Sequence, residues 1–165
     1  HVLFHHLRWL WPIHAVHHSD VDVDISTSYR HHPLEPLVFM PIILPTIMFL
    51  GVPLAAALTY QAIYIFLTIF SHSNVRLPQK LDRVLRLFIV TPDFHRIHHS
   101  SEVEFTNSNY GSIVPWYDYL FGTARRWDFD EHDHRRLGLE YHRELADSRL
   151  DKMLLAPLRT PDNNS

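Results

Sequence analysis

The sequence predicts an all-α integral-membrane protein with a transmembrane helical hairpin and a cytosolic, histidine-rich helical cap suited to two metal ions. Three observations predict this fold class. No charged residue occurs between Pro36 and Phe70. Eight histidines form three clusters at helical spacing, two before that stretch and one after it. The chain has 15 His and no Cys, which excludes disulfides, thiolate zinc sites and iron–sulfur clusters.

The length and charge of the chain limit the other possibilities. Its 165 residues suffice for one core. The net charge of −3, without a basic stretch among aromatic residues, argues against nucleic-acid binding. We expect one domain over residues 1–125 and a polar, soluble tail over 126–165. Because His1 itself belongs to a cluster, we also expect that an upstream membrane segment is missing from this sequence.

The first cluster is the pair His1 and His5, which share one face of a predicted helix over residues 1–18. In an unbroken helix, His14 would lie on the opposite face, because it follows His5 by nine positions. Pro12 can kink the helix or start a new one in its first turn. The break would let the second cluster turn round to meet the first.

The second and third clusters share the spacing His-x-x-His-His, at positions 14–18 and 95–99. Such side chains fall within about one third of a helical turn, so three imidazoles point into one small volume. Unpaired polar rings are costly to bury together, which makes a bound metal the usual explanation. The clusters hold more imidazoles than one ion needs and suit two. The expected ligands are His1, His5, His14, His17, His18, His95, His98 and His99.

The uncharged stretch 36–70 predicts two membrane helices. As one helix it would span about 50 Å, whereas the hydrocarbon core of a bilayer is about 30 Å thick. Gly51-Val-Pro53 breaks it into arms at 36–50 and 54–70, and prolines favour a kinked or re-entrant first arm. A buried hairpin of a soluble protein is the alternative.

A hairpin returns the chain to the side that it left, so the clusters before and after it can meet. Basic residues flank both of its ends and would share one face, which the positive-inside rule makes cytoplasmic. These residues are Arg8, Arg30, Arg76, Lys80, Arg83 and Arg86. The metal site is therefore expected on the cytoplasmic face of the membrane.

Three features follow the second arm. His72 comes directly after it and is a ninth candidate ligand, with a capping or interfacial histidine as the alternative. Residues 79–90 predict an amphipathic helix at the membrane surface. The aromatic stretch 115–123 is ascribed to packing and given no catalytic role. His6 faces away from the first pair, and the tail histidines lack cluster spacing, so no ligand is expected among His6, His132, His134 and His142.

The three clusters, in this order around a membrane hairpin, resemble the fatty acid hydroxylase/sterol desaturase superfamily, and in particular its bacterial sterol desaturase family members. The resemblance covers residues 1 to about 125, although Val2 stands where many members have Arg after the first histidine. Further matching segments are Arg30-His-His-Pro-Leu-Glu35, His72-Ser-Asn74, Asn109-Tyr-Gly111 and Trp116-Tyr-Asp-Tyr-Leu-Phe-Gly-Thr123.

The resemblance implies a membrane-bound oxygenase that holds two non-haem iron ions and uses O2 to hydroxylate or desaturate an alkyl C–H bond of a lipid. Imidazole alone does not name the metal, but oxidation of an unactivated C–H bond requires a redox-active ion, which zinc is not. No flavin or haem motif occurs, so electrons are expected from a separate donor protein. Glu35, Asp93 and Asp118 are candidates for carboxylates that hold the ligand rings in place.

Other functional classes fit the sequence less well. A membrane zinc hydrolase needs a carboxylate within its metal motif, as in His-Glu-x-x-His, and none occurs. A metal transporter would place ionisable residues in its membrane helices, but residues 36–70 contain no histidine and no charge. A non-catalytic or zinc-binding membrane protein rich in histidine remains the alternative. Iron content together with O2-dependent product formation separates it from the oxygenase.

Overall fold

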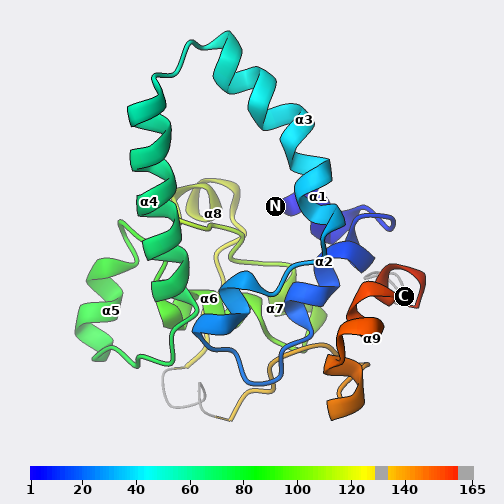
Figure 1. Ribbon diagram of the computed structural model, residues 1–165. Coiled ribbons are helices and arrows are strands. Elements are labelled where there is room, and N and C mark those ends of the chain that lie inside the picture. Colours follow the sequence, from blue (N-terminus) through cyan, green and yellow to red (C-terminus); the bar gives the residue numbers. More distant parts are fainter. Residues whose placement is uncertain (129–133, 160–165) are drawn as a thin grey trace.

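The structure is a computed structural model that describes residues 1–128 and 134–159 (Figure 1). Within these ranges the chain is helical and has no strand, and extended pairing is limited to an isolated bridge between Ser100 and Leu137. The α-helices are α1 (Val2–His6), α2 (Trp11–His18), α3 (Leu34–Phe49), α4 (Leu54–Ser71), α5 (Gln79–Leu85), α6 (Pro92–His98), α7 (Val103–Thr106), α8 (Trp116–Phe121) and α9 (Leu150–Leu154). The 3-10 helices are η1 (Ile25–Tyr29), η3 (Leu145–Ser148) and η4 (Ala156–Leu158).

The break predicted near Pro12 is confirmed. The first helix ends at His6, and α2 begins at Trp11 with Leu10 as its N-cap. Pro12 occupies the first turn of α2, where its missing N–H leaves no hydrogen bond unmade. Because the chain bends between the two helices, α2 packs against α1.

Two long apolar helices follow, close to the positions predicted from the uncharged stretch. Helix α3 continues through both Pro41 and Pro45, and α4 begins after Pro53. Gly51 adopts the left-handed conformation (φ 61°) in the turn between them, where L side chains are strained. Figure 1 shows α3 and α4 rising together from the other helices and meeting at this turn.

These two helices carry most of the exposed apolar surface. Within the described ranges, α4 is the one helix that is long and apolar enough to cross a membrane, by length and composition, and α3 is apolar but shorter. Phe49 at the end of α3 is 89% exposed, and Leu54 at the start of α4 is 74% exposed. This surface and the all-helical fold are consistent with a membrane protein.

The amphipathic helix predicted over 79–90 is shorter than expected, because α5 ends at Leu85. Its inner face is polar: Asp82 is buried, pairs with Arg86 and accepts a hydrogen bond from Thr91 at 2.6 Å. The carboxylate thus ties the end of α5 to the N-cap of α6, while the apolar residues of this segment remain largely exposed.

Part of the expected soluble tail packs against the helical core. Trp127 and Leu137 are buried with Val23 and Ile97, and Leu139 is buried with Trp11 of α2. The Gly138 N–H donates to the carbonyl of His99 at 2.9 Å. Residues 127–139, where described, are therefore not a solvated tail, since burying these apolar side chains stabilises them on the helices.

Candidate metal centre

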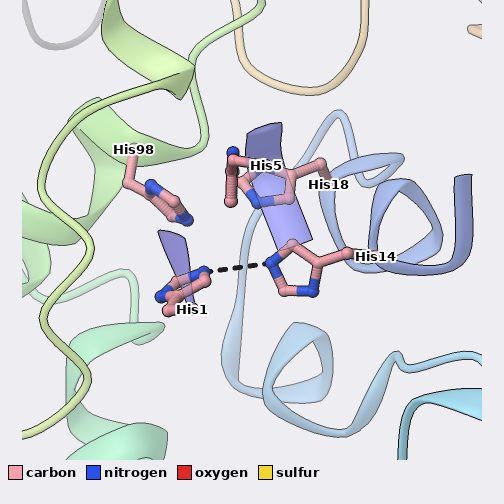
Figure 2. A group of neighbouring side chains, drawn as sticks. All are labelled: His1, His5, His14, His18 and His98. Carbon is pink, nitrogen blue, oxygen red and sulfur yellow. Dashed lines mark hydrogen bonds between the residues drawn. The ribbon is translucent and has the colours of Figure 1, made fainter. Parts of the chain in front are cut away.

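Nine histidines converge in two adjacent groups at the base of α3 and α4. Within each group, one nitrogen from each ring lies within 4.8 Å of the others. Group A consists of His1, His5, His14, His18 and His98, whose rings face a common centre in Figure 2. Group B consists of His17, His72, His95 and His99. All eight histidines expected as ligands are thus brought together, and His72 joins them.

Each His-x-x-His-His motif is divided between the two groups. The prediction that the three rings of a motif point into one small volume is therefore wrong. In the first motif, His14 and His18 belong to group A and His17 to group B. In the second motif, His95 and His99 belong to group B and His98 to group A. Helical residues advance by about 100°, so position i+4 lies about 40° from i and position i+3 lies about 60° away in the other direction. The middle histidine of each motif, His17 or His98, therefore faces a different group from the other two.

Hydrogen bonds fix which nitrogen of several rings faces the centre of its group. A carbonyl oxygen only accepts, so each ring nitrogen that contacts one carries the proton. The Nδ1 of His1 donates to the Tyr110 carbonyl (2.6 Å), that of His98 to the Ser108 carbonyl (2.7 Å) and that of His72 to the Thr68 carbonyl (2.8 Å). In the neutral rings, Nε2 is then left with a free lone pair that points inward.

The spacing of these inward nitrogens fits a metal ion. The Nε2 atoms of His1 and His14 lie 3.0 Å apart, as do those of His72 and His95, while His72–His17 and His95–His99 are at 3.3 and 3.2 Å. Two nitrogens at about 2.1 Å from one ion are about 3.0 Å apart at a right angle and about 3.4 Å apart in a tetrahedron. Facing lone pairs repel at such distances unless a cation lies between them.

Buried ring nitrogens support the same conclusion. Both ring nitrogens of His18, Nε2 of His98 and Nδ1 of His99 are buried and have no hydrogen-bond partner within the described ranges. Burial lowers the pKa of His98 to about 3 and that of His72 to about 4, so these rings are neutral at pH 7. Neutral imidazoles with bare nitrogens are the form in which histidine binds metals.

The carboxylate of Glu35 bonds to one histidine of group A and, through His31, is linked to group B. Glu35 accepts hydrogen bonds from Nδ1 of His14 and Nδ1 of His31, both at 3.0 Å. The ring of His31 in turn stacks on His17, with centroids 4.5 Å apart and an interplanar angle of 6°. His31 does not belong to a cluster of histidines at helical spacing, so its contact with the metal groups is not predicted from the sequence.

The other two candidate carboxylates are both buried. Asp118 accepts from the backbone N–H groups of Tyr110 and Gly111, both at 2.8 Å, and thereby holds the loop whose carbonyl orients His1. Asp93 is buried in the first turn of α6, and burial raises the pKa of its carboxyl. Of the three candidates, Glu35 bonds directly to a histidine of group A.

The remaining histidines stand outside both groups. His6 is exposed and contacts the Tyr110 hydroxyl at 3.0 Å, and His134 is exposed. His142 is partly buried 3.8 Å from Asp147, in a left-handed backbone conformation (φ 54°). His32 is buried and donates to the carbonyl of Leu154 at 3.2 Å. His132 lies outside the described residues.

The Tyr110 loop gives a first prediction. A Cβ on Gly111 would lie 2.6 Å from the carbonyl oxygen of Val114 and 3.0 Å from Oδ2 of Asp118, so Gly111→Ala must displace this loop. We expect a loss of roughly 1–3 kcal/mol in stability, measured as a lower Tm, with weaker metal retention because the loop orients His1. Ser112→Ala in the same loop is the control, and equal melting of both variants would contradict the prediction.

Comparison with known proteins assigns the family. The family model for fatty acid hydroxylase matches residues 1–123, which include all nine histidines of groups A and B. The chain belongs to the fatty acid hydroxylase family. No solved structure matches the chain.

Relatives within this family carry several names. The ornithine lipid hydroxylase of Rhizobium tropici is 32% identical over 74% of this chain. A very-long-chain aldehyde decarbonylase of Oryza sativa subsp. japonica is 29% identical over 99% of it. The human alkylglycerol monooxygenase is 27% identical over 74%. The chain spans 36% of the length of the first and 26% of each of the other two.

Proposed function

We propose that this chain is the metal-binding part of a membrane-bound oxidoreductase that hydroxylates or desaturates an alkyl C–H bond of a lipid. The proposed cofactor is two non-haem iron ions, one in each histidine group. The observation that carries the proposal is the division of nine imidazoles, eight of them buried, into two adjacent groups. The family and the names of its relatives, which include a lipid hydroxylase and a monooxygenase, support a lipid as the substrate.

When bound, two redox-active ions supply the reduction of O2 and the oxidation of an unactivated C–H bond, with electrons from a separate donor protein. The residues of the chain hold and orient these ions. His1, His14, His72 and His98 each turn a bare Nε2 inward, because backbone carbonyls or Glu35 hold the opposite nitrogen. The buried rings also exclude water from the centre of each group.

The proposed placement in the membrane follows from the same geometry. We place α3 and α4 in the bilayer as a hairpin, because both are apolar and largely exposed and meet at a short turn. Both ends of the hairpin then lie on one side, with His72 of group B directly after α4. The basic flanks favour the cytoplasmic side. The substrate alkyl chain would approach the metal groups from the bilayer.

The test is lipid analysis of cells with and without the full-length protein, grown under isotope-labelled O2. Hydroxylation gives a lipid alcohol that carries the label, and desaturation gives an alkene that depends on O2 without carrying it. Purified protein should contain iron. A protein that binds zinc under iron-replete conditions and forms no O2-dependent lipid product would instead be the non-catalytic or zinc-binding alternative.

Glu35 offers a second prediction. Glu35→Gln keeps one acceptor oxygen but turns an N–H2 group toward one of its two histidine partners, so His14 or His31 loses its bond. Such partners are typically worth about 10–100-fold in metal affinity, and we expect a loss of that size in competition with a chelator. The control is Glu102→Gln, since Glu102 is exposed and pairs with Arg135. Parent-like affinity in Glu35→Gln would contradict the role.

A further inference from the structure

The aromatic stretch ascribed to packing in the sequence analysis is instead largely exposed. Four side chains of α8 and two of the turn after α5 form an outward surface, here called the aromatic patch. Its residues are Leu87, Phe88, Trp116, Tyr117, Leu120 and Phe121, each between 50% and 73% exposed. Large exposed apolar surfaces of this kind mark contacts with a partner or a membrane.

Helix α8 is held firmly with this face outward. Trp116 Nε1 donates to the carbonyl of Leu87 at 2.7 Å, which joins the two parts of the patch. On the opposite face, the Tyr119 hydroxyl donates to the carbonyl of Arg86 at 2.9 Å. The Tyr119 ring also packs edge-on to Phe94 of α6, with centroids 6.1 Å apart. The patch is therefore a fixed outer surface of α8, which packs through Tyr119 on α6, the helix that carries His95 and His98.

We propose that the aromatic patch lies in the headgroup region of the lipid bilayer and sets the height of the metal centre below the membrane surface. The proposal rests on the membrane placement of α3 and α4 proposed above. In Figure 1, α8 lies on the side of α6 that faces the tip of α3 and α4, level with the N-terminal end of the chain, where His1 of group A lies. Helix α8, which carries most of the patch, therefore lies on the side of α6 toward which the two apolar helices extend.

The chemistry of the patch and its surroundings fits a lipid headgroup layer. Trp and Tyr present an apolar ring with a polar tip, and they concentrate at membrane–water interfaces. Exposed cations border the patch on both sides in the chain and would pair with lipid phosphates. They are Lys80, Arg83, Arg125 and Arg126. A protein partner would not require this combination of aromatic rings with flanking cations.

The test places single spin labels on the full-length protein, freed of other cysteines, in vesicles of phosphatidylcholine and phosphatidylglycerol. Labels at Leu120→Cys in the patch, Leu58→Cys on α4 and Leu145→Cys in η3 are compared for collision with O2, which concentrates in lipid, and with a water-soluble nickel complex. Leu58 is 61% exposed and Leu145 is 94% exposed. We expect position 58 to favour O2, position 145 to favour nickel, and position 120 to favour O2 at a shallower depth than position 58.

The other outcomes overturn the proposal in distinguishable ways. Nickel accessibility at position 120 equal to that at position 145, with position 58 in lipid, would refute the aromatic patch as a membrane contact while the placement of α4 stands. Dipolar broadening between labels at position 120 would show that a second copy of the chain covers the patch. Nickel accessibility at position 58 would refute the membrane placement itself, and the patch proposal with it.

Discussion

Replacing His98 with alanine will weaken metal binding in group A and abolish lipid turnover while the protein still inserts into the membrane. His98 contributes a bare, buried Nε2, and its Nδ1 is held by the Ser108 carbonyl, so no other described group takes its place. Outer partners of metal ligands are typically worth about 10–100-fold in affinity or activity. Loss of the ligand itself should exceed that range.

The controls separate ligation from general damage to the fold. His32→Ala also removes a buried histidine, but one that bonds Leu154 outside both groups, so it should lower Tm without lowering metal content. His134→Ala, at an exposed site, should change neither. Turnover by His98→Ala at the parent rate would refute the assignment of this residue.

Replacing His72 will remove one metal ion and leave the other. His72 is the C-cap residue of α4, and its Nε2 lies 3.0 Å from that of His95 and 3.3 Å from that of His17. Without it, group B keeps three imidazoles while group A keeps five. We expect metal content to fall from two ions to one, with activity lost, because the proposed chemistry uses both ions.

A matched substitution shows whether His72 is a metal ligand or only the C-cap of α4. Asparagine can still donate to the Thr68 carbonyl, which is the capping contact, but its amide is a poor replacement for an imidazole ligand. His72→Asn and His72→Ala should therefore lose the same metal ion. Full metal content in His72→Asn, combined with a loss in His72→Ala, would identify His72 as a structural cap.

The sequence predicts most of what local spacing determines. Pro12 predicts the bend that brings α2 back onto α1, because proline is tolerated in the first turn of a helix. Gly51 and Pro53 predict the turn between α3 and α4. Glycine tolerates the left-handed conformation that the turn requires, and α4 begins directly after Pro53. The His-x-x-His-His spacing predicts that these rings gather, but the prediction that all three rings of a motif share one volume is wrong. The angle of about 100° per helical residue explains why each motif divides between groups A and B.

What the sequence does not predict depends on contacts between distant segments. His31 has no periodic partner, and its role appears only where the fold brings its ring onto His17 and its Nδ1 onto Glu35. Leu137 lies in a charged region, yet it is buried against Val23 and Ile97. Helix α8 has a composition that suits a core, but its outer face remains exposed because α6 already covers the inner one.

The assignment of groups A and B as two metal sites is tested most directly by the number of metal ions in each chain. Full-length protein purified in detergent, stripped with a chelator and reloaded anaerobically with iron(II), should hold two iron ions per chain by elemental analysis. One site would be lost in His72→Ala, and metal binding to group A would be weakened in His98→Ala. A reproducible content of one ion, or of none, in the parent protein would contradict the assignment of groups A and B as two metal sites.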